Sequence, residues 1–255
     1  MQAKVSDFLA KLQEIAPFEN AEAYDNVGLL LGKADAKVTK VLLALDATLE
    51  VAEEAKRIGA ELIITHHPLM FHARKNLVED DPEARVICAL IRSHISLISA
   101  HTNLDKSIFS GSHACAEILG LKNIRQEGLL FLGETESELT AAILQERIAQ
   151  LIDKDVRMYG DSSQKIRTLA ICGGAYDEGW EEAAALGADA YLTGEVRHHN
   201  AIASVMAEQV MYDAGHFGTE ATLIEPLCTY LQKWINDVKY DVLVFASKAD
   251  PYGRV

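Results

Sequence analysis

The amino-acid sequence predicts an α/β protein made of two similar lobes related by an internal repeat. Apolar segments of strand length alternate with amphipathic segments of helical length, which favours parallel strands covered by helices. With 255 residues and a hydrophobic fraction of 49%, the chain can bury a sizeable core. We therefore expect a first α/β lobe at 1–121 and a second at 122–255, closely packed because no Pro- or Gly-rich linker separates them.

The first half carries the signals of alternating helices and strands. Pro17 stops an N-terminal helix, and Asp81-Pro82 opens a later one, because proline in the first helical turn loses no hydrogen bond. The segments KVLLALDA and ELIITHHP are predicted strands on either side of a helix that ends at Gly59. The expected elements are a helix at 4–16, a strand within 24–30, a strand at 40–47, a helix at 49–59, a strand at 61–68, a helix from 81, a strand within 95–105 and a helix ending near 120.

The second half repeats this pattern after an intervening stretch. Residues 122–165 are predicted to form a strand around GLLFLGE, a helix at 137–152 and a short strand at 156–159. Residues 41–67 then align without a gap on 169–195, and ISLISAHTNLD at 95–105 aligns on VMYDAGHFGTE at 210–220. The second alignment pairs His101 with His216 and Asp105 with Glu220. Two H-x-x-x-[DE] motifs at equivalent places favour a shared functional origin.

Composition excludes several classes of protein. The formal charge of −14 argues against nucleic-acid binding, which depends on Lys and Arg at phosphates. No apolar run reaches membrane-spanning length, and the charged N-terminus is unlike a secretory signal. The four cysteines form no C-x-x-C pair, so buried thiols in a reducing cytoplasm are expected.

Polar residues gather where the predicted strands end, and they are metal-ligand types. His66 and His67 follow one strand, His101 and Asp105 another, and His216 and Glu220 a third. In parallel sheets these ends meet at one edge, so the residues could converge on one cleft between the lobes. Up to six donors exceed what a single zinc needs and favour a two-metal centre of Zn, Mn, Fe, Co or Ni.

Two features of this interpretation leave alternatives open. Adjacent residues on a regular strand point to opposite faces, although Pro68 ends the strand and frees His67 to turn. A satisfied polar histidine at a strand end is the alternative at His66 or His67. In TGEVRHHNA, at 193–201, Glu195 and His199 are candidates for acid–base catalysis, and the alternative is an ordinary first helical turn.

Five segments in order resemble a known family. They are YDNVGLLLG at 24–32, ITHHP at 64–68, SAHTNLD at 99–105, LTGEVRHHNA at 192–201 and DAGHFGTE at 213–220. Together they resemble the GTP cyclohydrolase I type 2 homologue family, also called the Nif-three-like family, in its short form without an inserted domain.

The resemblance implies a two-lobed subunit with a dinuclear site and a ring-shaped homohexamer. Matched by position, the resemblance implies that the metal ligands are His66, His67, Asp105, His216 and Glu220. His101 matches the motif as a ligand or as a group that orients Asp105 or water, and we count it with Glu195 and His199 among the catalytic candidates.

The expected function is metal-dependent hydrolysis of a nucleotide or phosphoester, and the family name suggests opening of the guanine ring of GTP. The alternative is a non-catalytic metal-binding or scaffold assembly. An open coordination position favours catalysis, and a closed one favours the alternative.

Overall fold

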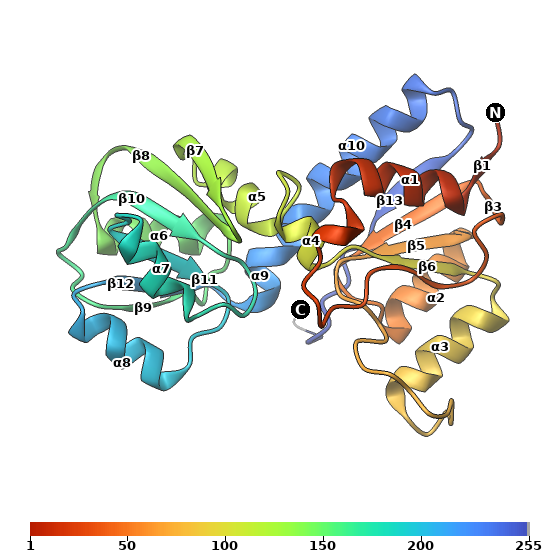
Figure 1. The fold of residues 1–255 in the computed structure, drawn as a ribbon, viewed down its shortest axis with the longest axis horizontal. Coiled ribbons are helices and arrows are strands. Elements are labelled where there is room, and N and C mark those ends of the chain that lie inside the picture. The colour runs from red at the N-terminus through yellow and green to blue at the C-terminus, as the bar shows by residue number, and fades with distance from the viewer. Residues whose placement is uncertain (254–255) are drawn as a thin grey trace. The chain divides into compact units, whose positions relative to one another are not determined.

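The computed structural model describes residues 1–253 and divides into two compact units. Unit 1 combines Met1–Ser107 with the C-terminal segment that begins at Ile224, and unit 2 is Ile108–Leu223. The boundary expected at residue 121 differs from this division, because the chain enters unit 2 before helix α5 (Gly111–Ile118) and returns to unit 1 for its last helix. Figure 1 shows the elements of each unit.

Unit 1 is a parallel sheet with one antiparallel edge strand. Its strand order is β13-β4-β5-β6-β2, with β2 antiparallel to β6. The strands are β2 Gly28–Leu31, β4 Lys40–Ala44, β5 Leu62–Thr65, β6 Ser96–Ser99 and β13 Leu243–Ala246. A separate antiparallel pair joins β1 Ala3–Lys4 to β3 Lys37–Val38. The four residues of β5 are all buried, as expected of a parallel strand covered on both faces.

Helices cover both faces of this sheet (Figure 1). The helical elements of unit 1 are α1 Val5–Ile15, η1 Phe18–Asn20, α2 Leu49–Ile58, α3 Pro82–Arg92, α4 Thr102–Asp105 and α10 Ile224–Asp237. On one face, α2 and α3 pack against the sheet through Val51, Ala55 and Leu90. On the other lie α1 and α10, where Phe8 and Trp234 meet edge to face at 5.4 Å.

The predicted helix signals of unit 1 are confirmed by their caps. The Asp81 side chain accepts a hydrogen bond from the Ala84 N–H at 2.9 Å, with Pro82 in the first turn of α3. Helix α2 ends at Gly59, whose φ of 72° is the left-handed conformation that glycine adopts without strain.

Unit 2 is a six-stranded mixed sheet in the order β7-β8-β10-β11-β12-β9. Its strands are β7 Lys122–Glu127, β8 Leu130–Thr140, β9 Arg157–Tyr159, β10 Lys165–Ile171, β11 Ala190–Thr193 and β12 Val210–Asp213. Its helical elements are α5, α6 Ala141–Leu151, α7 Gly179–Ala185, α8 His198–Met206, α9 His216–Glu220 and η2 Ala221–Leu223. Strands β10, β11 and β12 are parallel, as are β4, β5 and β6, so the aligned segments have the same strand arrangement in their own sheets.

One predicted boundary is wrong. The helix expected at 137–152 begins at Ala141, because β8 continues through Thr140 and pairs there with Lys165 and Ile166 of β10. Cross-strand pairing thus overrides the local helical preference of these residues. Within residues 1–253, no helix combines the length and apolar character needed to cross a bilayer.

Candidate metal centre

The end of strand β5 places two consecutive histidines with their rings close together. The backbone N–H groups of His66 and His67 still bond to Ala44 and Leu45, which extends the pairing of β5 with β4. Their ring centroids are nevertheless only 5.0 Å apart. Alternation on a regular strand would direct the two rings to opposite faces, so the chain turns here as Pro68 predicts.

His101 brings a third imidazole to the same place. It precedes the short helix α4, and its ring centroid lies 5.1 Å from that of His66 and 5.4 Å from that of His67. One ligand atom from each of the three histidines can be chosen so that all lie within 4.8 Å of one another. We call His66, His67 and His101 the histidine cluster.

Each ring of the histidine cluster has its Nδ1 atom beside an oxygen that can accept a hydrogen bond. The pairs are His66 with the Ala100 carbonyl at 3.0 Å, His67 with Asp46 Oδ1 at 2.8 Å and His101 with Asp25 Oδ1 at 2.9 Å. A carbonyl or carboxylate oxygen only accepts, so Nδ1 carries the hydrogen. In the neutral ring Nε2 then presents a lone pair, which is the arrangement of metal-binding histidines.

Asp105 adds a carboxylate next to the histidine cluster. We call the histidine cluster together with Asp105 the half-site of unit 1. Asp105 is the last residue of α4, and its Oδ1 lies 3.6 Å from Nε2 of His66, whose side chain is fully buried. With Nδ1 donating to Ala100, a neutral His66 would direct a lone pair towards a carboxylate. A cation that both atoms could bind would stabilise this pair, so the residues present fit a divalent metal.

Asp25 anchors the half-site from a distant part of the sequence. Besides His101, its carboxylate accepts hydrogen bonds from the N–H and the hydroxyl of Thr102. Burial by itself raises the pKa of Asp25, but the hydrogen bonds from His101 and Thr102 outweigh it and hold the pKa well below its usual range. Asp25 therefore stays ionised and fixes the His101 ring.

Unit 2 has a different group of ligand-type residues, in which one imidazole lies between two carboxylates. We call Glu195, His216 and Glu220 the half-site of unit 2. Glu195 Oε1 lies 2.6 Å from Nδ1 of His216, and Glu220 Oε2 lies 2.9 Å from its Nε2. The Glu220 side chain is buried at 7% exposure, whereas that of Glu195 is 58% exposed. His216 and Glu220 begin and end the single turn of α9.

Bare glycine backbone surrounds this second half-site. A methyl group on Gly194 would lie 2.7 Å from Cα of His216 and from Oγ1 of Thr219. A methyl group on Gly174 would overlap Glu220 Oε1. Helix α9 can approach the strand ends this closely only because neither position has a side chain. Gly194 aligns with His66, so a counterpart of that histidine has no room here, and His67 aligns with Glu195.

The segment that carries Glu195 is held by a buried carboxylate. Asp177 accepts hydrogen bonds from the backbone N–H and the guanidinium of Arg197 and from the Asn200 amide. Burial opposes ionisation of Asp177, but these donors lower its pKa. His199, in the first turn of α8, is exposed, and the structure brings it to neither half-site through any contact described in residues 1–253.

Sequence reasoning missed Asp25 and Asp46, the carboxylates that orient rings of the histidine cluster. Asp46 follows strand β4, so its strand-end position was a usable signal. Asp25 lies within the segment YDNVGLLLG, which contributes to the family resemblance, but the sequence assigned no role to this residue.

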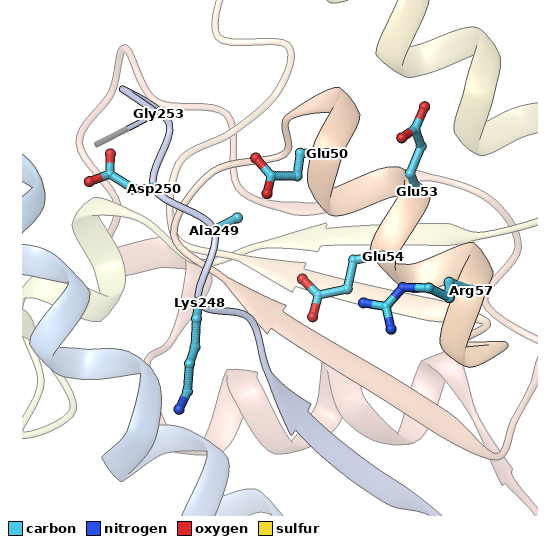
Figure 2. A pocket seen from close by; sticks show the side chains of 8 residues that line it. All are labelled: Glu50, Glu53, Glu54, Arg57, Lys248, Ala249, Asp250 and Gly253. Atoms are coloured by element: carbon cyan, nitrogen blue, oxygen red, sulfur yellow. The ribbon is translucent and has the colours of Figure 1, made fainter. Parts of the chain in front are cut away.

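A pocket of about 610 Å³ elsewhere in unit 1 contains none of the predicted site residues. Figure 2 shows its charged lining, in which Glu50 and Glu54 point from α2 towards the C-terminal segment. Glu54 accepts a hydrogen bond from the Ser247 hydroxyl at 2.6 Å. Cys115 is a poor nucleophile, because burial raises the pKa of its thiol to about 12.

A family model described as Duf34/NIF3 (NGG1p interacting factor 3) matches residues 3–251. The chain belongs to this family. It is 34% identical to a Clostridium perfringens protein called GTP cyclohydrolase 1 type 2 homolog, over 98% of both chains. A Streptomyces coelicolor protein of the same name is 32% identical over 98% of this chain and 93% of its own length.

Solved structures of the family share the fold over nearly the whole chain. A hypothetical protein of Staphylococcus aureus matches with a TM-score of 0.92 and 32% identity, over 99% of both chains. Reduced HcgD from Methanocaldococcus jannaschii matches with a TM-score of 0.81 and 25% identity, over 98% of this chain and 99% of that one. A Bacillus cereus protein related to NIF3 matches in fold, with a TM-score of 0.93 at 22% identity.

Proposed function

We propose that this family member binds two divalent metal ions and uses them as a metal-dependent hydrolase. The observation that carries the proposal is the histidine cluster, in which three Nδ1 atoms are each held by an oxygen acceptor while the three rings lie within 5.4 Å of one another. Such outer hydrogen bonds fix the tautomer and orientation of metal-binding histidines. A purely structural histidine needs no such convergence.

The ligands we propose are His66, His67 and Asp105 of unit 1 with His216 and Glu220 of unit 2. His101 is either a sixth donor or a positioning group. Neither group of residues alone offers the donors of two complete coordination spheres. Imidazole and carboxylate without thiolate suit Zn, Mn, Fe, Co or Ni.

Divalent ions in this centre would supply Lewis acidity to the scissile group. The chain's own contribution is orientation and proton transfer. Glu195 holds His216 through Nδ1 and is more than half exposed, so its carboxylate can also reach water or a bound substrate. Asp25 and Asp46 accept hydrogen bonds from Nδ1 of His101 and His67, which leaves a lone pair on Nε2 of each ring. Because relatives carry the name GTP cyclohydrolase 1 type 2 homolog, a purine nucleotide is the substrate class we propose.

Elemental analysis of protein purified without added metal tests the centre. We expect about two ions per chain in the parent. His67→Ala and Glu220→Ala should each lower that content, and Glu53→Gln, which changes an exposed carboxylate in the pocket of Figure 2, should not. Less than one ion per chain after metal supplementation, with no response to either alanine variant, would contradict the proposal.

Hydrolysis needs a separate test with metal-loaded protein. We expect formate release or phosphate release from GTP that disappears in Glu195→Gln even when excess metal keeps that variant fully loaded. Full metal occupancy without turnover of any nucleotide or phosphoester in a broad panel would favour a non-catalytic metal-binding protein.

A further inference from the structure

Two exposed aromatic side chains lie together in unit 1. Tyr24 is 66% exposed and Phe71 is 39% exposed, although both are large and apolar in their rings. Their centroids are 6.2 Å apart with the planes at 60°. Single exposed apolar residues are ordinary, whereas two neighbouring exposed rings offer a flat apolar ligand a place to stack. We call Tyr24 and Phe71 the aromatic pair.

The aromatic pair is joined to the histidine cluster. The Phe71 ring meets the His101 ring edge to face, with centroids 6.2 Å apart. Tyr24 directly precedes Asp25, whose carboxylate holds His101. Asn26 donates a hydrogen bond of 2.6 Å to the Met70 carbonyl, so the segments that carry the two aromatic residues are tied to each other.

The charges around the aromatic pair favour an uncharged ring over an anion. Burial of part of the side chain, followed by the charges of Glu22, Asp25 and Asp105, raises the pKa of Tyr24. The phenol is therefore neutral at physiological pH and adds no negative charge to this surface. A planar, neutral aromatic ring can stack on such a surface without an electrostatic penalty.

We propose that Tyr24 and Phe71 form a stacking subsite for the nucleobase of the substrate. This subsite rests on the proposed function and specifies how the site takes a nucleotide: the base lies on the aromatic pair, beside His101. Stacking tolerates any base, so the aromatic pair selects for a flat ring rather than for guanine.

Binding of guanosine 5′-monophosphate and ribose 5-phosphate to the full-length protein tests this subsite by calorimetry. We expect the parent to bind the nucleotide more tightly than the sugar phosphate. Tyr24→Leu and Phe71→Leu should each weaken nucleotide binding about tenfold and leave sugar phosphate binding unchanged. Tyr24→Phe keeps the ring and should retain the parent affinity. Ile91→Ala, which removes an exposed apolar side chain on α3, is the surface control and should also retain it.

Three outcomes would overturn the subsite. The first is a parent protein that binds both ligands equally well, and the second is a leucine variant that keeps the parental nucleotide affinity. The third is a leucine variant in which only the sedimentation coefficient changes, which would make the aromatic pair a contact between protein chains. Metal content of the same samples, measured separately, distinguishes the two proposals. Ring-dependent nucleotide binding by a protein that takes up no metal would sink the hydrolase proposal and leave the subsite standing.

Discussion

The half-sites of the two units begin from matching sequence positions but differ in chemistry. Unit 1 has three imidazoles with three carboxylates beside them, those of Asp25, Asp46 and Asp105, whereas unit 2 has one imidazole between two carboxylates. The difference traces to two adjacent positions, because His66 aligns with Gly194 and His67 aligns with Glu195. His66 has room at the end of β5. A methyl group added to the aligned Gly194 would lie within 2.8 Å of atoms of α9 and of the Gly174 carbonyl oxygen. Close packing of a helix turn thus excludes a counterpart of His66 from unit 2.

The largest effect should come from removing the buried carboxylate of unit 2. Glu220→Gln keeps the shape of the side chain but removes the negative charge beside His216 Nε2. We expect metal affinity to fall by at least about 100-fold, more than loss of an outer hydrogen bond costs. Titration with a competing chelator measures this. Asp105→Asn, the corresponding change in unit 1, should have the smaller effect because Asp105 is more exposed. Equal effects would break the distinction between the half-sites.

Placing a side chain at position 194 should be the next largest change. Gly194→Ala forces a methyl group against His216 and Thr219, which should cost about 2–3 kcal/mol in the free energy of unfolding, as overpacking does. Urea denaturation followed by circular dichroism measures it. Gly187→Ala has open space around the added methyl but a φ of 82°, so it provides a control for backbone strain alone. A stable Gly194→Ala would show that α9 can move, and the packing argument would fail.

A smaller effect is expected from the carboxylates that orient the rings. Asp46→Asn and Glu195→Gln each weaken the acceptor beside a histidine Nδ1, at His67 and His216 respectively. Loss of such partners costs about 10- to 100-fold in metal affinity. We expect the lower end for Glu195→Gln, because Glu195 is the more exposed of the two. The same chelator titration compares them, and the opposite order would contradict exposure as the deciding factor.

The smallest effect concerns the loop behind Glu195. Asp177→Asn weakens the hydrogen bonds from the Arg197 backbone and from Asn200, for an expected loss of about 1–2 kcal/mol in the free energy of unfolding at pH 7. The pKa of Asp177 is lowered in the folded chain from the ordinary 3.8, so its stabilisation is present above that pH and is lost as the pH falls below it.

Urea denaturation of the parent and of Asp177→Asn between pH 7 and pH 3 measures this dependence. The two proteins should therefore differ at pH 7, and the difference should shrink as the pH falls below 3.8 towards the lowered pKa of the folded chain. A difference independent of pH would assign the effect to packing.

Local signals in the sequence predicted most of the fold of unit 1. The cap of α3 at Asp81 and the end of α2 at Gly59 are local events, so short-range patterns sufficed. The extension of β8 to Thr140 depends on its pairing with Lys165, and no pattern within 137–140 reveals that partner.

The same distinction holds for the candidate site. The histidine cluster was predictable because each member follows a strand and the strand ends meet at one edge of a sheet. The role of Asp25 was not, because the residue precedes β2 and reaches His101 only through the fold. The exposed position of His199 likewise depends on which way the first turn of α8 faces.

The route of the chain between units has a consequence for the order in which the protein folds during synthesis. Unit 2 is continuous in sequence and can be completed while its last strands leave the ribosome. Unit 1 begins first but lacks β13 and α10 until the C-terminal segment emerges, so β4 is left as an unpaired edge strand throughout translation of unit 2. The nascent chain therefore holds an unfinished first unit, with an edge open to wrong pairing, until its final residues arrive.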